Sequence, residues 1–382
     1  MTALNMEYNF DQTTDRRGTA SLKWERYRGR DIVPLWVADM DFRSPPEMLE
    51  ALHKRVEHGV FGYPVPPHAL VDTIVERMQR MHGWAIEPDW IVWLPGVVVG
   101  LNVACRAIGQ PGDQVATFTP IYPPFLSAPR HVQKSTIRVP LAKQGDRYTF
   151  DVDRFGASIT AHTHMLLLCN PHNPVGRSFD RAELARVAEV CLGHNIVICS
   201  DEIHCDLILD DKRHVPTATL GREVEQQTIT LMAPSKTFNI PGLGCAMAII
   251  PNGNLRRRFL DARSGLVPHV NVLGYEAALA AYRHCEPWRQ ALLAYLRGNR
   301  DLLLREVNRI PGLAMGPVEA TYLAWIDASA LGVDDPPRFF EQAGVGLSDG
   351  AEFEGPGFVR LNFGCPRATI EQALERIGNI VR

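Results

Sequence analysis

The segment Ala-Pro-Ser-Lys-Thr-Phe-Asn-Ile-Pro-Gly-Leu at 233–243 places one lysine just after a short apolar stretch. Residues 228–233 are β-branched and apolar, which predicts a buried strand that ends where Ser235 and Lys236 begin a loop. Open α/β sheets hold their ligands at such strand ends. A lysine in an apolar pocket can react as a neutral amine, so Lys236 is a candidate covalent attachment point. Since a single lysine is more often a solvated surface residue, this assignment of Lys236 depends on what the rest of the chain shows.

The composition is ordinary for a soluble globular protein. The chain has 382 residues, of which 46% are hydrophobic and 22% charged, so it can form one large core and a smaller one. Its formal net charge is −3. Proteins that bind nucleic acid or an anionic membrane normally carry a basic excess, so we expect neither partner and favour a small-molecule ligand.

The cysteines and the first residues indicate a cytoplasmic protein. The eight cysteines include no C-x-x-C pair, and several lie in apolar strand-like runs, as reduced buried thiols do. Residues 1–15 lack the basic and apolar regions of a signal peptide, and no apolar run approaches 18 residues. We therefore expect neither secretion nor a membrane span.

Apolar strands alternate with helical periodicity from residue 68 onward, which predicts an α/β fold with a mainly parallel sheet between helices. After residue 270 the pattern changes to long helices over 274–282 and 287–310, then strands over 321–326 and 357–362, and a last helix from Thr369. We expect a large domain over 46–285 and a smaller α+β domain made of 1–45 and 286–382. The predicted strands of the large domain are 91–94, 115–118, 165–169, 196–200, 229–233 and 246–250.

Three other predicted strands also end in segments that could carry chemistry. The first is followed by Leu94-Pro95-Gly96-Val97-Val98-Val99-Gly100, before a helix expected to start near Leu101. Backbone N–H groups at a helix start favour a phosphate, although an ordinary tight turn explains the glycines equally well. The segment lacks the G-K-[ST] ending of a Walker loop and is not a dinucleotide-binding fingerprint.

The other two strand ends carry an amide and a carboxylate. Asn170-Pro171-His172-Asn173-Pro174 forms a proline-stiffened turn that can present an Asn amide, or it simply caps the loop. Ser200-Asp201-Glu202-Ile203-His204 places a carboxylate after a buried strand, where it needs a cationic or hydrogen-bonding partner unless it caps a helix. We expect all four strand ends to converge on one edge of the sheet.

In their order and spacing these motifs resemble the fold-type I pyridoxal-phosphate enzymes, the aspartate aminotransferase superfamily. The matching pattern is N-P-x-N-P-x-G, then S-D-E, then S-K about 35 residues later, within a resemblance that spans nearly the whole chain. The resemblance implies that Lys236 attaches the cofactor pyridoxal 5'-phosphate as a Schiff base and that Asp201 pairs with the ring nitrogen. Asn173 would donate to the ring oxygen O3′ and Tyr122 would stack on the ring. His204 stands where many relatives have a tyrosine, so its contact with the ring is less certain.

The phosphate and the substrate carboxylate would be held by further residues. The resemblance assigns the phosphate to the amides of Val97 and Val98 and to the Ser235 hydroxyl. Many relatives add an arginine eight residues after the lysine, where this chain has Gly244. Tyr63, in Phe-Gly-Tyr-Pro, matches a tyrosine that reaches the phosphate from the neighbouring subunit, which implies a homodimer.

Arg360 matches the family arginine that binds the substrate carboxylate; a structural salt bridge is the alternative reading of a mid-strand arginine. Residues 36–42, Trp-Val-Ala-Asp-Met-Asp-Phe, could close over the same carboxylate with Ala38, and Asn173 would also contact the substrate. We expect Asp39 and Asp41 to fix the geometry of this loop rather than to act in catalysis.

Four segments together resemble the MalY/PatB branch, the cystathionine β-lyase or C–S lyase type: W-V-A-D-M-D-F, H-G-V-F-G-Y, S-D-E-I-H-x-D-L and A-P-S-K-T-F-N-I-P-G-L. The resemblance implies a lyase that splits cystathionine, cystine or a related amino acid into pyruvate, ammonia and a thiol. An aminotransferase is the alternative, since it would use the same ring contacts. A regulatory protein without turnover is a further alternative, and we expect no metal site, since His162 and His164 lack partners at ligand spacing.

Overall fold

The computed structural model describes residues 8–381, and the largest sheet in that range has seven strands. The five strands from β9 to β4 are parallel, and β10 runs antiparallel between β9 and β2. Because β2 thus points the same way as β9, the ends of β2, β7, β8 and β9 lie at one edge. The predicted α/β class is confirmed. In spatial order the strands are β2 (Ile91–Leu94), β10 (Ala246–Ile249), β9 (Thr228–Met232), β8 (Val197–Asp201), β7 (Thr163–Cys169), β3 (Gln114–Thr119) and β4 (Ser135–Pro140).

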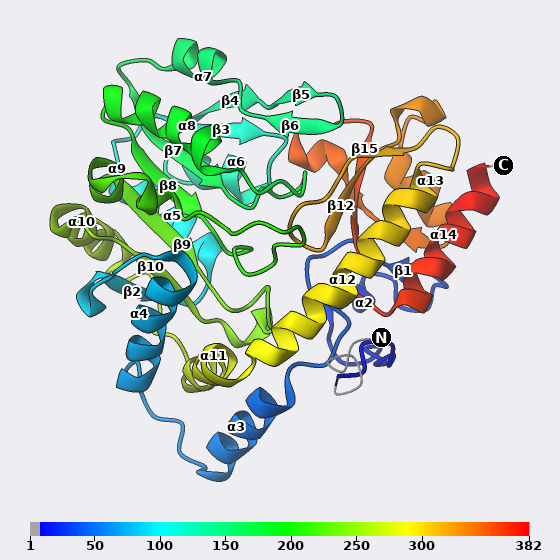
Figure 1. The fold of residues 1–382 in the computed structure, drawn as a ribbon, viewed down its shortest axis with the longest axis horizontal. Helices are drawn as coiled ribbons and strands as arrows, with labels where there is room; N and C mark the ends of the chain where they lie inside the picture. The colour runs from blue at the N-terminus through cyan, green and yellow to red at the C-terminus, as the bar shows by residue number, and fades with distance from the viewer. Residues whose placement is uncertain (1–7, 382) are drawn as a thin grey trace.

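Helices cover both faces of this sheet (Figure 1). The central strand β7 shows why, because Met165 and Leu167 lie in one apolar core while Leu166 and Leu168 lie in the other. The first core also takes residues from α5 (Val97–Ala107), α6 (Pro124–Arg130) and α10 (Gly253–Arg263). The second takes residues from α7 (Val152–Ser158), α8 (Arg181–Gly193) and α9 (Arg222–Gln226), while α4 (His68–His82) and α11 (Val272–His284) contribute to a third.

Three of the differences from the sequence prediction have a clear physical reason. Strand β4 was not predicted because it lies at the sheet edge and buries only Val139 of its residues. Helix α5 begins at Val97 rather than near Leu101, with Gly96 as its N-cap in an extended conformation. Strand β12 (Leu323–Asp327) begins two residues late, because Thr321 has a φ of 74° that an extended strand does not allow.

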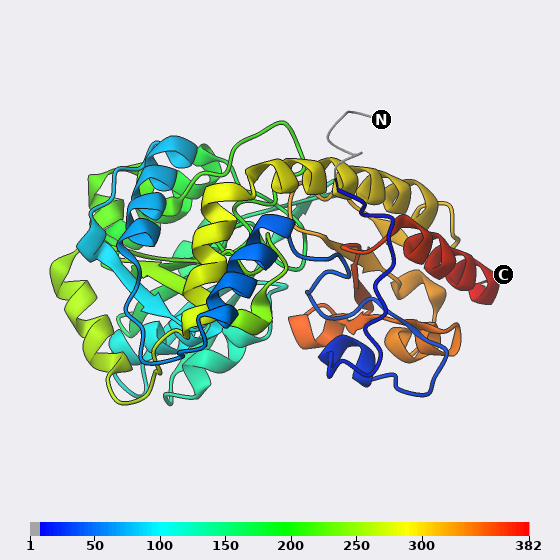
Figure 2. The same ribbon diagram turned by 90° about the horizontal axis from the view of Figure 1, so that it is seen from below.

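The long helix α12 (Glu286–Val307) connects the large sheet to a second group of elements (Figures 1 and 2). This group contains a four-stranded antiparallel sheet within the described range, covered by α13 (Pro336–Gln342) and α14 (Arg367–Val381). Its strands are β11 (Ala314–Met315), β12, β15 (Phe358–Asn362) and β14 (Ser348–Asp349). A hairpin of β5 (Ala142–Gln144) and β6 (Arg147–Thr149) lies apart from both sheets.

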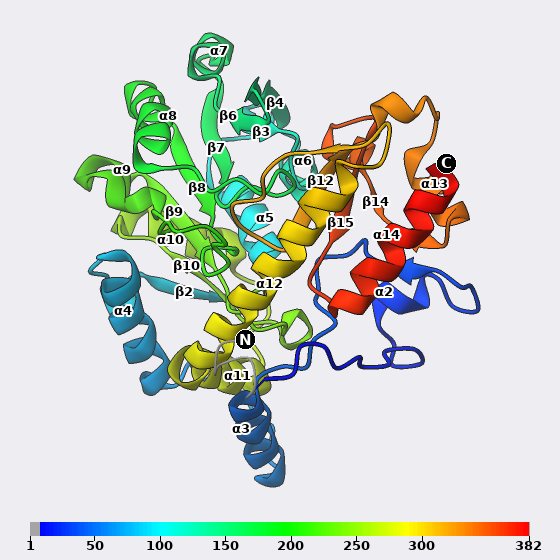
Figure 3. The same cartoon turned by 45° about the vertical axis from the view of Figure 1, so that its right-hand side comes forward.

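The N-terminal segment packs on the second group. Strand β1 (Val33–Pro34) pairs in parallel with β13 (Val345–Gly346), and α2 (Leu22–Glu25) lies near the C-terminal elements in Figure 3. Helix α3 (Pro46–Glu57) packs instead on α11 of the large unit. These contacts support a domain boundary near residue 45, which stays a prediction. None of the helices in the described range has the length and apolar character that a membrane span requires.

Candidate active site

A cavity of about 200 Å³ opens at the edge of the sheet where β2, β7, β8 and β9 end. Its lining includes every residue predicted to contact the cofactor except Tyr63. Tyr63 lies outside the cavity, and its side chain is fully exposed. Arg360 lies behind this lining and donates through Nη1 to Asn173 Oδ1 at 2.9 Å. The lining includes Ala38, Val97, Val98, Tyr122, Asn173, Asp201, His204, Ser235 and Lys236.

Lys236 follows β9. Its amine lies against residues 36–42, a segment that comes from the N-terminal part of the chain and is called the strap below. Its Nζ donates to the Ala38 carbonyl oxygen at 2.7 Å. Burial, reinforced by the positive charge of Arg360, lowers the pKa of this amine to about 8. A lysine in this setting is far more often neutral near pH 8 than a solvated lysine, as a nucleophile or a base requires.

Asp201 is the last residue of β8 and its carboxylate is buried. Oδ1 accepts a hydrogen bond from the Ile203 amide at 3.1 Å, and no lysine, arginine or histidine of residues 8–381 forms an ion pair with it. Burial raises the pKa of this carboxyl to about 7. A buried carboxylate without a cation is costly, so the site fits a ligand that brings a protonated nitrogen.

Arg360 lies on β15 with its guanidinium buried, and in the described part of the chain it contacts only neutral groups. Besides Asn173, it donates through Nη2 to the Trp36 carbonyl at 3.0 Å and to Ser348 Oγ at 3.3 Å. Its Nε has no partner, and burial lowers the pKa of the group to about 10. The salt bridge that would give Arg360 a purely structural role is not found within residues 8–381. Its positive charge therefore has no counter-ion there, and Nε has no acceptor, which suits a carboxylate ligand.

The start of α5 forms one end of the cavity. Gly96 provides no side-chain cap, so the amides of the first turn, including those of Val97 and Val98, can meet an anion. Gly244 lines the same end with a φ of 58°, and a Cβ there would lie 3.1 Å from the Pro95 carbonyl. This geometry favours glycine at position 244, because a side chain there would strain the backbone and crowd the Pro95 carbonyl.

Tyr322 and Asn239 contribute to the site and were not identified from the sequence. The Tyr322 hydroxyl donates to the same Ala38 carbonyl at 3.0 Å, and its ring faces the edge of His204 at a centroid distance of 6.1 Å. Asn239 donates to the carbonyl oxygens of Met40 and Phe42. Asn239 lies within the 233–243 motif, but the motif does not show its contacts, and Tyr322 stands in none of the motifs, so only the folded chain reveals the role of either residue.

The acidic residues of the strap have the structural role expected for them. Arg16 forms ion pairs with Asp39 at 2.6 Å and with Asp41 at 2.8 Å, and Lys23 pairs with Asp41 at 2.6 Å. Their carboxylates are therefore neutralised within the strap and fix its conformation.

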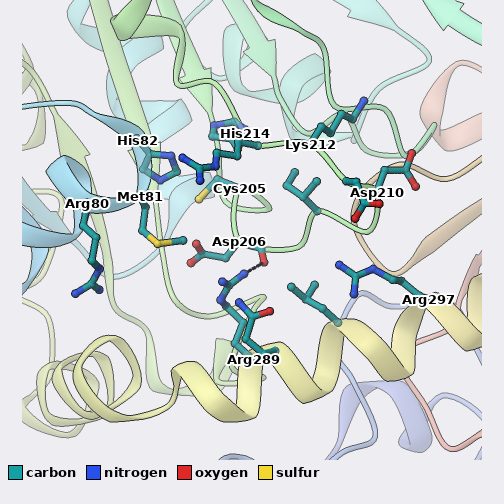
Figure 4. A pocket seen from close by; sticks show the side chains of 15 residues that line it. Arg80, Met81, His82, Cys205, Asp206, Asp210, Lys212, His214, Arg289 and Arg297 are labelled. Carbon is teal, nitrogen blue, oxygen red and sulfur yellow. Dashed lines mark hydrogen bonds between the residues drawn. The ribbon is translucent and has the colours of Figure 1, made fainter. Parts of the chain in front are cut away.

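A second, larger cavity of about 440 Å³ lies between the end of α4, the loop after β8 and α12 (Figure 4). It contains none of the predicted site residues, and its acidic residues Asp206 and Asp210 pair with Arg77 and Arg300, both at 2.6 Å. No group of three His, Cys, Asp or Glu residues in the described range is placed to hold a metal ion. The smaller cavity is thus the candidate active site.

Comparison with known proteins places the chain among enzymes with this arrangement. The family model described as aminotransferase class I and II matches residues 30–377. Cystathionine beta-lyase PatB of Bacillus subtilis is 37% identical, over 97% of this chain and 98% of the relative.

Two solved structures match the fold over nearly its full length. The crystal structure of OvoB is 48% identical with a TM-score of 0.96, and covers 98% of this chain and 99% of that chain. Cystalysin of Treponema denticola, whose structure contains a pyridoxal 5'-phosphate cofactor, is 34% identical with a TM-score of 0.94 and 98% coverage of both chains.

Proposed function

This chain belongs to the class I and II aminotransferase family, and we propose that it is a pyridoxal-phosphate-dependent carbon–sulfur β-lyase. It cleaves cystathionine, cystine or a related sulfur amino acid by α,β-elimination into pyruvate, ammonia and a thiol. The observation that carries this proposal is one cavity lined by a buried amine and a carboxylate without a cation, with a guanidinium that lacks a carboxylate hydrogen-bonded to the Asn173 side chain of its wall. Relatives that are named cystathionine beta-lyase and that match 97% of this chain favour this activity over transamination.

The residues of the cavity fit pyridoxal 5'-phosphate group by group. Lys236 offers the amine for covalent attachment, and Asp201 supplies the negative partner for a protonated ring nitrogen. Because Arg360 occupies Asn173 Oδ1, the Asn173 amide nitrogen remains available as a donor. Tyr122 supplies an aromatic face, and the first turn of α5 with Ser235 supplies donors for the phosphate. When bound, this cofactor supplies an electron sink that stabilises negative charge at the substrate Cα.

The protein's own residues then position the substrate and move one proton. Arg360 binds the substrate carboxylate through its guanidinium fork, supported by Asn173 and the Ala38 segment. This fixes Cα near Lys236, whose neutral amine takes the Cα proton. The thiolate on Cβ then departs with the electron pair of the C–S bond, and hydrolysis of the remaining three-carbon unit gives pyruvate and ammonia.

An aminotransferase reaction is the competing function, because the family includes such enzymes. The two reactions differ in their need for a second substrate. We expect the purified protein to release pyruvate and a thiol from cystathionine in equal amounts without any added oxo acid. The Lys236→Ala variant is the control and should release neither. A strict requirement for an oxo acid, with no thiol released, would assign the protein to transamination.

We further propose a cytoplasmic homodimer in which Tyr63 of one subunit reaches the active site of the other. The side chains of Val60, Phe61, Tyr63 and Val65 are between 55% and 102% exposed, which is unusual for apolar residues unless a partner covers them. The cysteines in the described range are all free, which supports a reducing compartment. The division into 46–285 and 1–45 with 286–382 is part of the same proposal.

A further inference from the structure

Residues 36–42 form a strap whose carbonyl oxygens are held by side chains from both structural units. Each carbonyl oxygen from Trp36 to Met40 accepts at least one side-chain hydrogen bond. Such a density of donors on an irregular segment is much higher than a connecting loop needs. The strap is therefore fixed in position rather than merely attached.

Two of these bonds come from the groups that handle the substrate. Arg360 Nη2 donates to Trp36 O at 3.0 Å, and Lys236 Nζ donates to Ala38 O at 2.7 Å. The two acceptors are separated by a single residue of the same strap. Trp36 O and Ala38 O thus set the spacing between the guanidinium and the amine.

Asn239 is the side chain from the lysine loop that holds the strap. Its Nδ2 donates to Met40 O at 2.8 Å and to Phe42 O at 2.9 Å, while its Oδ1 accepts from the Met40 amide at 2.8 Å. Asn239 lies three residues after Lys236, so the same short loop carries both the amine and the clamp on its acceptor. On the other side, Asn362 Nδ2 donates to Val37 O and Asp39 O, both at 2.6 Å.

We propose that Asn239 is a positioning residue that acts on Lys236 through the strap, by holding Ala38 O where it accepts from the lysine amine. The proposal rests on the proposed function in that Lys236 is the attachment point and proton carrier. When Lys236 is free of the cofactor, Ala38 O is its sole hydrogen-bond acceptor in the described structure. The bond therefore keeps the amine near the substrate Cα instead of letting it swing away.

The strap also affects how readily Lys236 carries a proton. A hydrogen bond to the ammonium form favours that form, so loss of Ala38 O as acceptor should lower the pKa of Lys236. The Tyr322 hydroxyl competes for the same acceptor at 3.0 Å, so its removal should have the opposite effect. The titratable groups that surround the amine are Asp39, Asp201, His204, Tyr322 and Arg360. Of these, Asp39 lies on the strap itself, and because its negative charge raises the pKa of Lys236, its displacement with the strap would lower that pKa in the same direction.

The choice of variant follows from the backbone. Asn239 has a φ of 57°, so an alanine would strain the chain whereas glycine keeps the conformation and removes only the clamp. Asn195 is the matched control, because it has a φ of 54°, is exposed and lies outside the site. The variants are therefore Asn239→Gly, Asn195→Gly and, for the opposite effect, Tyr322→Phe.

The experiment measures the acetylation rate of Lys236 against pH by mass spectrometry, in the full-length protein freed of pyridoxal phosphate. We expect the pKa of Lys236 to fall by about one unit in Asn239→Gly, to rise in Tyr322→Phe and to stay unchanged in Asn195→Gly. In the cofactor-bound enzyme, Asn239→Gly should lower kcat about tenfold with little change in KM.

Unchanged labelling in a folded Asn239→Gly protein, or shifts in the same direction in both site variants, would overturn the proposal. A lower unfolding temperature alone would mark Asn239 as merely structural. The labelling needs no turnover, so a protein without lyase activity could still show the shift. Failure of the positioning role and failure of the proposed function are thereby distinguished.

Discussion

Asp201 and Arg360 are buried ionisable residues whose missing charge partners only a ligand would supply. Each is an ionisable side chain in a buried place, and in residues 8–381 neither has an ion-pair partner of opposite sign. Leaving a buried charge unpaired costs several kcal/mol in general, which a protein without a ligand has no reason to bear. A protonated cofactor nitrogen next to Asp201 and a substrate carboxylate next to Arg360 would supply the missing charge partners.

We predict that Asp201→Asn stabilises the cofactor-free protein at pH 8. Burial raises the folded-state pKa of Asp201 to about 7, above the 3.8 of an unfolded chain. The folded state therefore holds the proton more tightly, so wild-type stability falls as the pH rises through this range. Urea unfolding should show a gain of about 2 kcal/mol for Asp201→Asn at pH 8 and almost none at pH 4. With pyridoxal phosphate bound, the wild-type protein should be more stable than Asp201→Asn. If Asp201→Asn were less stable than the wild type at pH 8 without cofactor, the claim that Asp201 lacks a cationic partner would be contradicted.

Arg360→Lys should impair substrate binding although it keeps the positive charge. Lysine cannot offer the two parallel donors that a carboxylate accepts from a guanidinium. We expect kcat/KM for cystathionine to fall about 100-fold or more, mostly through KM. Ser348→Ala is the control, since it keeps the guanidinium and removes only neutral hydrogen bonds, one from Arg360 at 3.3 Å and one to the Trp36 carbonyl at 2.7 Å; it should cost less than about tenfold. Equal losses in the two variants would show that the fork is not what binds the substrate.

At the scale of elements, we propose that the start of α5 binds the cofactor phosphate in place of the arginine that this chain lacks at Gly244. Three consecutive valines leave the backbone amides of its first turn accessible, and Lys236 is the sole lysine or arginine in the lining of the described cavity. Phosphate binding at helix starts relies on such amides and on the helix dipole. The anion is therefore held mainly by the backbone.

Restoring an arginine by Gly244→Arg should accordingly weaken the protein rather than improve cofactor binding. The φ of 58° and the Pro95 carbonyl at 3.1 Å both disfavour a side chain. We expect a loss of about 1–2 kcal/mol in unfolding free energy and no tighter Kd for pyridoxal phosphate. Gly242→Arg, at a position with open space around its Cβ, should lose less stability. A tighter Kd in Gly244→Arg would show that the phosphate lacks charge neutralisation.

Sequence patterns predicted the elements that are buried on both faces and failed elsewhere for physical reasons. Continuous apolar runs such as 165–169 mark central strands, whereas β4 at the edge buries a single residue and gives no such run. The order and spacing of the motifs predicted that Lys236, Asp201 and Asn173 lie close together, and all three line one cavity. It could not reveal Asn239 or Tyr322, because their role depends on the path of the strap, which no local periodicity encodes.

At the scale of the whole molecule, Tyr63 separates a monomer from a shared-site dimer. It is 102% exposed and does not line the cavity of its own chain. If it acts across a dimer interface, two inactive variants can complement each other, since a symmetric dimer has two equivalent sites.

We predict that mixed dimers of Lys236→Ala and Tyr63→Ala subunits regain activity. Random pairing makes half of the dimers hybrid, and each hybrid has one intact site out of two, which gives about a quarter of wild-type activity. Refolding the two variants together and assaying lyase activity measures this. The Lys236→Ala protein alone should be inactive, and a mixture no more active than the mean of its parents would place Tyr63 outside the site of the partner.

The central claim is that Lys236 is the residue to which pyridoxal phosphate is covalently attached. Borohydride reduction of the cofactor-bound protein, followed by peptide mass spectrometry, tests it directly because reduction makes the attachment permanent. The account predicts one pyridoxyl group per chain, located on Lys236 in the 233–243 segment, and none in the Lys236→Ala protein. A label on another lysine such as Lys134, or no label at all, would contradict it.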